Sequence, residues 1–441
     1  MKRKSYPTAL YVLLCCLLSN MYLPVKYCPW LLFLLLPAYL FVLLFAGMFR
    51  LDTKSKRLRL GHHGAVLLLS FQLSTLFSVL YHGLLAFVLL PEHPWTLVWS
   101  IVLCAVLEYL LFWDGILCVY FTSVQLGLKM RLVGLLCGMI PVVNLVVLNF
   151  ILRTVFREVR VECEKEAINR SRKAQKLCRT KYPILMVHGV FFRDSRFFNY
   201  WGRIPRELEQ NGASVYYGNH QSAATIQQSA AELAERIKSL VAELGCEKVN
   251  IIAHSKGGLD CRYALSQLDV APYVASLTTV NTPHRGCLFA DCLLTKISPK
   301  TKDRVADAYN RTLKKLGDTN PDFLSAVTQL TATYCADFNS NNPQPEGVYC
   351  QSVGSVLPKA GGGKFPLNFS HHIVSYYDGE NDGLAGERSF PWGDRYICLR
   401  PKTSRGISHG DMIDLNRQNF EGFDVREFYV DLVKDLKDKG F

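Results

Sequence analysis

The sequence lacks the cysteine patterns that mark a disulfide framework or a redox motif. It has 15 cysteines, but no two form a CxxC pair and their spacings follow no framework. Internal repeats and low-complexity tracts are also absent, which argues against solenoid and disordered classes. We therefore expect reduced, buried thiols, a pattern that favours the cytoplasmic side of a membrane.

Residues 182–441 lack net charge, although the whole chain is formally +13 at pH 7. They contain 29 basic and 29 acidic residues. The excess lies at residues 1–150, with 11 basic against four acidic residues, and at 151–181, with 10 against four. Lys and Arg beside apolar segments set membrane orientation and meet anionic headgroups. The basic charge therefore does not indicate a nucleic-acid partner, and we expect none.

Charge is scarce in the first 150 residues because long apolar runs fill them. Four runs approach the roughly 20 apolar residues that cross a bilayer; they are "CPWLLFLLLPAYLFVLLFAGMF", "GAVLLLSFQLSTLFSVLYHGLLAFVLL", "WTLVWSIVLCAVLEYLLFWDGILCVYF" and "RLVGLLCGMIPVVNLVVLNFIL". The shorter "TALYVLLCCLLSNMYLP" is a fifth span or a signal peptide, although no small-residue cleavage site follows it. We expect a membrane domain at residues 1–152 with four or five transmembrane helices, followed by a basic helical linker at 153–181.

The side of the membrane that the remaining chain faces stays open. The basic segments "MKRK", "RLDTKSKRLRLGHH" and "LKMR" indicate cytoplasmic loops, which would place the later chain outside after five spans. Basic "RTVFREVR" argues for the inside, as would four spans or a re-entrant "CGMIPVVN".

Residues 182–441 alternate short apolar runs with amphipathic helical patterns. The expected strands are "PILMVHG", "ASVYYGN", "KVNIIAHS", "SLTTVNTP", "GVYCQSVGS" and "DRYICLR", and the clearest helices are "AAELAERIKSLVAELG" and "DVREFYVDLVKDLKD". This alternation predicts an α/β domain, a mostly parallel sheet with helices on both faces. Residues 286–346 form a long insertion, which is either a lid over the site or a set of helices that pack on the sheet edge.

The stretch "NIIAHSKGGLD" predicts a nucleophile elbow at Ser255. An exposed nucleophile needs a sharp strand-to-helix turn with small residues two before and two after it. Ala253 and Gly257 meet this need, in the form A-x-S-x-G. The alternative is an ordinary loop hydroxyl, since small residues flank many serines.

The first strand ends in His188 and Gly189, where the N–H of Val190 could face an oxyanion. The N–H of Lys256, at the start of the helix after Ser255, would be the second donor. An ordinary strand-ending turn is the alternative explanation for the His-Gly pair.

A carboxylate and an imidazole follow in the order that α/β hydrolases use. Asp382 lies in an Asn-Asp-Gly turn, and His409 lies in a late loop before the last helix. Plain turn chemistry would explain the first of these as well. Asp378 is the rival for the acid, and we expect the side chain of Lys256 to be solvated.

These motifs together resemble the secreted bacterial triacylglycerol lipases of the α/β-hydrolase fold. The resemblance covers about residues 182–420 and is carried by "VHG", "YWGRIP", "AHSKGG", "NTPHRG", "NDGLAG" and "SHGDM". It implies Ser255 as nucleophile, Asp382 as acid and His409 as base, with oxyanion N–H groups from Val190 and Lys256.

The expected function is a membrane-anchored serine esterase or lipase that cleaves lipid acyl esters through an acyl-enzyme, placed in a bacterial cell membrane. The alternatives are an acyltransferase or thioesterase on the same triad, or a non-catalytic protein whose hydrolase fold binds a lipid or partner. The substrate's chain length and head group, and the oligomeric state, stay open.

Several features depart from the family's pattern. Phe191 and Phe192 stand where glycines usually follow the His-Gly pair, and the apolar N-terminal region has no counterpart in the secreted enzymes. Asp411 matches a calcium ligand of some relatives, but no clear second carboxylate accompanies it, so we expect no cofactor or metal.

The remaining ionisable residues receive no role. The pairs His62-His63 and His371-His372 lack acidic or Cys companions in sequence and are expected in loops. Glu108 and Asp114 fall in an apolar stretch, where ionisable groups are costly.

Overall fold

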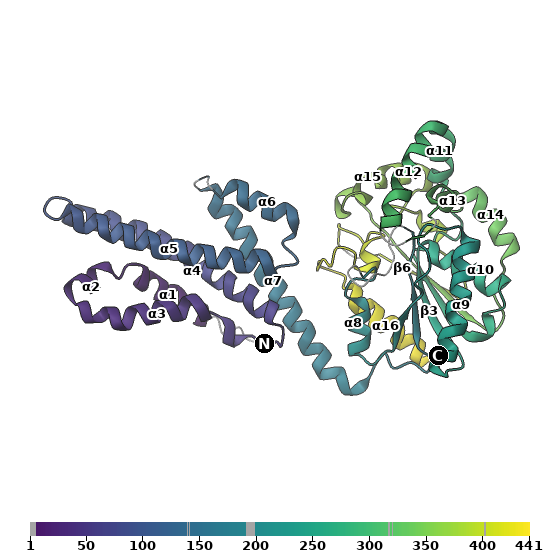
Figure 1. Ribbon diagram of the computed structural model, residues 1–441, viewed down its shortest axis with the longest axis horizontal. Coiled ribbons are helices and arrows are strands. Elements are labelled where there is room, and N and C mark those ends of the chain that lie inside the picture. The colour runs from purple at the N-terminus through teal and green to yellow at the C-terminus, as the bar shows by residue number, and fades with distance from the viewer. Residues whose placement is uncertain are drawn as a thin grey trace. The chain divides into compact units, whose positions relative to one another are not determined.

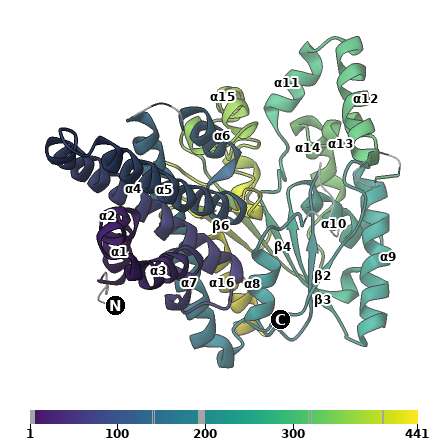
Figure 2. The same cartoon turned by 60° about the vertical axis from the view of Figure 1, so that its left-hand side comes forward.

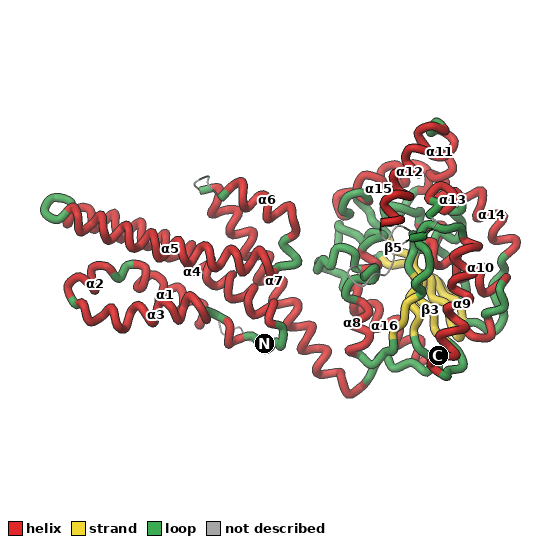
Figure 3. Tube along the Cα trace, viewed as in Figure 1, coloured by secondary structure: helices red, strands yellow, loops and turns green. Residues whose placement is uncertain are grey.

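The computed structural model describes residues 6–138, 140, 142–190, 199–315, 318–319, 321–400 and 403–441. The chain divides into two compact units, Met1–Arg170 and Ser171–Phe441. The first unit is helical, and the second combines a sheet with helices, as the colours of Figure 3 show.

The first unit is built around two long helices, α4 and α5, that run side by side (Figures 1 and 2). A short turn at residues 90–93 joins them. The helices are α1 (Tyr6–Ser19), α2 (Tyr22–Tyr27), α3 (Leu32–Phe45), α4 (Lys56–Leu89), α5 (Pro94–Thr122), α6 (Gly127–Cys137) and α7 (Val143–Arg172).

Two of these helices, α4 and α5, are long and apolar enough to cross a membrane, by length and composition. The helices α1 and α3 are apolar but have only 14 residues each. The last predicted apolar run, residues 131–152, is divided between α6 and α7. The expectation of four or five spans is therefore not confirmed, because apolar composition alone did not reveal where each helix ends.

A buried carboxylate joins three segments of the first unit. Glu158 of α7 is 2% exposed and pairs with Arg57 of α4. It also accepts hydrogen bonds from Ser123 Oγ at 2.6 Å and from the N–H groups of Val124 and Gln125. Burying a carboxylate is costly unless it is paired and hydrogen-bonded, and Glu158 meets both conditions.

The second unit contains one parallel sheet of six strands in the order β2-β1-β3-β4-β5-β6. The strands are β1 (Ile184–Val187), β2 (Val215–Tyr217), β3 (Val249–His254), β4 (Val274–Val280), β5 (Tyr349–Ser355) and β6 (Arg395–Leu399). Five lie within the predicted runs, and β4 begins two residues before its predicted run "SLTTVNTP". The predicted α/β architecture is confirmed.

Helices cover both faces of this sheet (Figures 1 and 2). Helices α8 (Ile204–Gln210) and α16 (Val425–Asp438) pack on one face, and α9 (Ile226–Leu244) and α10 (Lys256–Gln267) pack on the other. The other helices of this unit are α11 (Leu288–Lys296), α12 (Pro299–Lys315), α13 (Phe323–Thr328), α14 (Ala332–Asn341) and α15 (Leu367–Asp378).

The alternation of side chains along β1 explains why two apolar cores form. Ile184 and Met186 join the cluster that includes residues of α8 and α16, whereas Leu185 and Val187 join the cluster with α9 and α10. Successive strand residues point to opposite faces, so a strand covered on both sides is apolar throughout.

The insertion between β4 and β5 contains helices α11 to α14. On α14, Cys335 and Phe338 are buried against Ile226 and Leu259. Arg262 of α10 lies over the Phe338 ring and bonds Asn339 Oδ1 at 2.8 Å, which anchors α14 to the sheet domain. The packing interpretation therefore holds for α14. Only Ala306 and Leu313 are buried in α12, so a lid role remains a hypothesis for α11 and α12.

All 15 cysteines are described and all are free thiols; seven are buried, as expected, and eight are partly exposed. The two His pairs lie in helices, His62-His63 in α4 and His371-His372 in α15, so the prediction of loops was wrong. His371 Nε2 lies 2.7 Å from the Leu357 carbonyl, a contact that stabilises a His inside a packed helix.

Candidate active site

Ser255 occupies a strained turn between β3 and α10. Its backbone has φ 55° and ψ −132°, a combination that non-glycine residues rarely adopt. The Ser255 N–H donates to the Val280 carbonyl of β4 at 2.9 Å, so the sheet fixes the turn. The predicted elbow geometry is therefore present at the carboxyl end of β3, where ligands of parallel α/β sheets bind.

Close packing explains the small residues around the elbow. A Cβ on Gly189 would lie 2.8 Å from Ser255 Cβ, and a Cβ on Gly257 would lie 2.3 Å from the His188 carbonyl oxygen. Neither position has room for a side chain. Ala253 stands where G-x-S-x-G motifs have glycine, and its methyl group joins the apolar cluster on the α9 and α10 face.

Asp382 and His409 are held together in the fold. Asp382 Oδ2 lies 2.6 Å from His409 Nδ1 and accepts from Asn281 Nδ2 at 2.6 Å. Asp382 Oδ1 accepts from the N–H groups of Leu384 and Ala385. The His409 N–H also donates to the Asp382 carbonyl at 2.9 Å. With Nδ1 engaged by the carboxylate, Nε2 is the nitrogen that can accept a proton.

His409 lies beside the elbow. Its ring centroid is 4.5 Å from that of His254, the residue before Ser255. Within the described part of the chain, no hydrogen bond joins Ser255 Oγ to His409. Catalytic hydrogen bonds of this kind are often long without substrate and tighten when it binds.

Asp378, the rival for the acid, has a different contact. At the end of α15, its carboxylate accepts from the N–H groups of Leu288 and Phe289 at 2.9 and 3.0 Å. Burial raises the pKa of Asp378, while these two hydrogen bonds oppose the rise. The carboxylate therefore caps the N-terminus of α11 rather than orienting His409.

His188 sets the orientation of the candidate oxyanion peptide. Its Nδ1 lies 2.9 Å from the Gly189 carbonyl oxygen. That carbonyl and the Val190 N–H belong to one planar trans peptide, so the N–H points away from the His188 ring. Phe191 and Phe192, which follow, lie outside the described residues.

Sequence reasoning missed Tyr200 and His254, which support this loop. The Tyr200 hydroxyl lies 3.0 Å from the Gly189 nitrogen, whose N–H donates to it, and 2.7 Å from His254 Nδ1. Burial, and then the nearby His409, hold the pKa of His254 well below its usual value, so His254 stays neutral. Both residues belong to motifs that the sequence analysis quoted, Tyr200 to "YWGRIP" and His254 to "AHSKGG". Asn281, which was also missed, belongs to "NTPHRG".

The side chain of Lys256 is buried, so the expectation of a solvated Lys was wrong. It is 1% exposed, and Nζ lies 2.6 Å from Asp260 Oδ1 and 3.1 Å from Ser229 Oγ. Burial raises the pKa of Asp260 to about 6, although Lys256 favours its ionised form. The missed signal was the i,i+4 spacing of Lys256 and Asp260, which places both on one helix face.

Asp411 does not fit a calcium site. Both of its carboxylate oxygens face Arg405, at 2.9 and 3.1 Å, and Oδ2 also accepts from the Ser408 N–H and hydroxyl. A guanidinium thus fills the place that a cation would take.

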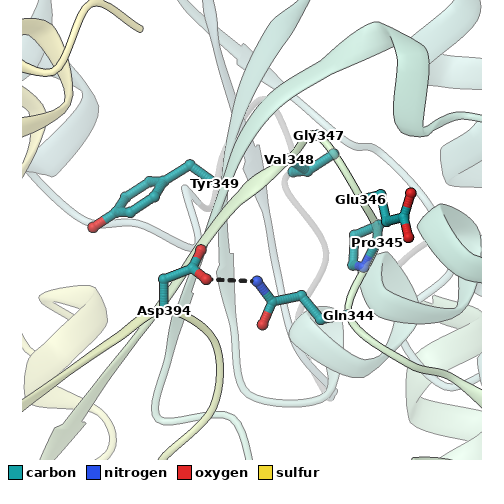
Figure 4. A pocket seen from close by; sticks show the side chains of 7 residues that line it. All are labelled: Gln344, Pro345, Glu346, Gly347, Val348, Tyr349 and Asp394. Atoms are coloured by element: carbon teal, nitrogen blue, oxygen red, sulfur yellow. Dashed lines mark hydrogen bonds between the residues drawn. The ribbon is translucent and has the colours of Figure 1, made fainter.

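A surface pocket lined by residues 344–349 and Asp394 lies at the amino-terminal ends of strands β5 and β6 (Figure 4). Tyr349 begins β5 and Asp394 directly precedes β6, whereas Ser255 follows the last residue of β3. In a parallel sheet the starts and the ends of the strands lie on opposite sides, so the pocket and Ser255 are at opposite ends of the strands. Gln344 donates to Asp394 across this pocket, which is separate from the candidate catalytic residues.

Comparison with known proteins finds lipases. No family model matches the chain. It is 34% identical over 177 residues to a triacylglycerol lipase of Pseudarthrobacter phenanthrenivorans, covering 37% of this chain and 54% of that protein. It is also 34% identical over 177 residues to a triacylglycerol lipase of Burkholderia plantarii, covering 37% of this chain and 49% of that protein. The chain thus spans about half the length of these relatives.

Among solved structures, a lipase of Bacillus licheniformis in its mature form is similar at 22% identity. The match covers 58% of this chain and 92% of that one, with a TM-score of 0.43. The parallel sheet and the strand–turn–helix at Ser255 are features of the α/β-hydrolase fold in their own right.

We predict that Asp382→Asn lowers kcat on an ester substrate by about 10⁴-fold, the effect typical of a triad carboxylate. Its carboxylate holds Nδ1 protonated, and an amide would favour the wrong tautomer. Asp378→Asn is the control, and it should keep kcat within about threefold because its carboxylate accepts from the start of α11 and not from His409. Steady-state kinetics of the two variants decide between the two acids; equal losses would contradict the assignment.

Lys256→Met should reduce the free energy of unfolding by about 3–5 kcal/mol, because it leaves Asp260 buried without its partner. Lys434→Met is a matched control. Lys434 and Asp438 form the same i,i+4 pair at 2.7 Å, but with both side chains about half exposed. Loss of the Lys434–Asp438 pair should reduce the free energy of unfolding by no more than about 0.5 kcal/mol. Denaturant unfolding monitored by circular dichroism measures both values; similar losses would show that burial does not distinguish the pairs.

Proposed function

We propose that this protein is a serine hydrolase that cleaves carboxylic esters of lipids. The observation that carries the proposal is the Asp382–His409 hydrogen bond beside the strained Ser255 turn. The triacylglycerol lipases among its relatives support a lipid ester as the substrate.

In the proposed reaction, His409 Nε2 takes the Ser255 hydroxyl proton as Oγ attacks the ester carbonyl. The N–H groups of Lys256 and Val190 stabilise the oxyanion of the tetrahedral intermediate. His409 then donates the proton to the leaving alcohol and leaves an acyl group on Ser255. Water, activated by His409, releases the acid, while Asp382 stabilises the imidazolium in both steps.

The expected activity is hydrolysis of p-nitrophenyl esters by the detergent-solubilised protein, with kcat/KM rising from short to long acyl chains. Ser255→Ala should lower this activity by at least about 10³-fold, since the nucleophile is lost. Product analysis with an added alcohol tests acyl transfer to that alcohol. Hydrolysis that persists in Ser255→Ala, with no background enzyme, would contradict the proposal.

We further propose that the first unit anchors the enzyme in a membrane. Many large apolar side chains lie on its surface, and their exposure to water would be unfavourable. Those more than 70% exposed include Phe33, Leu84, Phe87, Trp95 and Phe121. Anchoring would hold an acyl hydrolase beside its lipid substrate.

Alkaline carbonate extraction of cell membranes tests this anchoring. The full chain should stay in the membrane pellet after carbonate and after high salt, and enter solution only with detergent. Release by high salt would mean that the protein is held only by electrostatic attraction between its basic segment at residues 153–181 and anionic lipid headgroups. Either form of release without detergent would overturn the anchoring proposal.

A further inference from the structure

Three metal-ligating side chains meet between α4 and α5, far in sequence from the candidate triad. His63 Nε2 lies 3.7 Å from Asp114 Oδ2, and Cys118 Sγ lies 3.5 Å from Asp114 Oδ1. One ligand atom from each residue can be chosen so that all three lie within 4.8 Å of one another. The acidic and Cys companions that the sequence did not show for His63 are thus supplied by the neighbouring helix.

Local geometry explains why these residues meet. Asp114 and Cys118 are four residues apart and share one face of α5. The backbones of α4 and α5 approach closely at two glycines. A Cβ on Gly64 would lie 2.6 Å from Cys118 Cβ, and a Cβ on Gly115 would lie 3.1 Å from the Gly64 carbonyl oxygen. The three side chains therefore flank a closely packed helix crossing, which favours a fixed geometry.

A hydrogen bond sets the tautomer of His63 for metal binding. His63 is 2% exposed, and its Nδ1 lies 2.8 Å from the Ala46 carbonyl oxygen. A carbonyl only accepts, so Nδ1 carries a hydrogen; in the neutral imidazole that binds a metal, the lone pair is then on Nε2, the nitrogen that faces Asp114. Metal-binding histidines are commonly oriented by this kind of second hydrogen bond.

The combination of nitrogen, oxygen and sulfur donors selects the metal. Calcium and magnesium prefer all-oxygen sites, whereas zinc takes His, Cys and carboxylate ligands in tetrahedral geometry. Zinc bonds of about 2.0–2.3 Å place tetrahedral ligand atoms about 3.3–3.7 Å apart. The 3.5 Å between Cys118 Sγ and Asp114 Oδ1 lies in this range. His63 Nε2 is 3.7 Å from the other oxygen, Oδ2, and one ligand atom from each residue lies within 4.8 Å of the other two, so a small inward movement of the side chains would complete the site. A carboxylate and a thiolate would also neutralise the dication, which suits apolar surroundings.

We propose that His63, Asp114 and Cys118 bind a Zn²⁺ ion that clamps α4 to α5. The three side chains leave the fourth tetrahedral position for a water molecule or another ligand, and the Asp114 side chain, 35% exposed, leaves room for it. This inference is independent of the proposed ester hydrolysis, because it concerns only the first unit.

Cobalt titration of the full-length protein in detergent, after chelator treatment, tests the proposal. Co²⁺ is the probe because a thiolate ligand gives a near-ultraviolet charge-transfer band and tetrahedral sites give strong visible bands. The expected result is saturation at one equivalent, with Zn²⁺ displacing the colour. Cys118→Ser should abolish the charge-transfer band, and His63→Gln should weaken binding by more than about 100-fold.

Cys104→Ser and His82→Gln are the matched controls, since they remove a buried Cys from α5 and a buried His from α4 outside the cluster. Both should retain the wild-type spectrum. Circular dichroism verifies that each variant is folded, and Cys118→Ser decides alone if His63→Gln fails to fold. No cobalt binding by the wild type, or an unchanged band in Cys118→Ser, would overturn the zinc site.

Discussion

The hydrogen bond between Asp382 and His409 is the interaction on which the proposed chemistry depends. Asp382 is fully buried, and its charge is tolerable because Asn281, Leu384 and Ala385 also donate to the carboxylate. These donors come from the end of β4 and from the turn after α15, so folding of the sheet assembles the site. The carboxylate in turn fixes which nitrogen of His409 is basic. The network links sheet topology to a proton-transfer role.

The turn at Ser255 and the loop that carries the proposed oxyanion N–H of Val190 are coupled through close packing. Gly189 lies against Ser255, Tyr200 bonds both Gly189 and His254, and the His254 ring packs beside His409. Strain in the Ser255 backbone is held in place by these contacts. Behind them, the buried Lys256–Asp260 pair joins the first and second turns of α10, so the start of that helix is electrostatically fixed as well.

Much of the sheet domain could be predicted because its strands are short apolar runs and several of them end in a motif, as "NIIAHS" ends at Ser255. Contacts between segments that are distant in the sequence could not be predicted. The burial of the Lys256 side chain depends on α9, which supplies Ser229, and the companions of His63 come from another helix. Helix ends in the first unit also escaped prediction. The sequence left open whether residues 131–152 form one span or re-enter at "CGMIPVVN", and composition alone did not decide between α6 and α7 as two helices and a single helix.

The most direct test of the central claim is fluorophosphonate labelling of the detergent-solubilised protein, followed by mass spectrometry of the labelled peptide. If Ser255 is activated by His409 and Asp382, the probe adds to Ser255 alone and Ser255→Ala takes up none. A folded wild-type protein that stays unlabelled, or a label on another serine, would contradict the account. The unlabelled result would favour the non-catalytic binding protein, and a label elsewhere would assign the nucleophile to another serine.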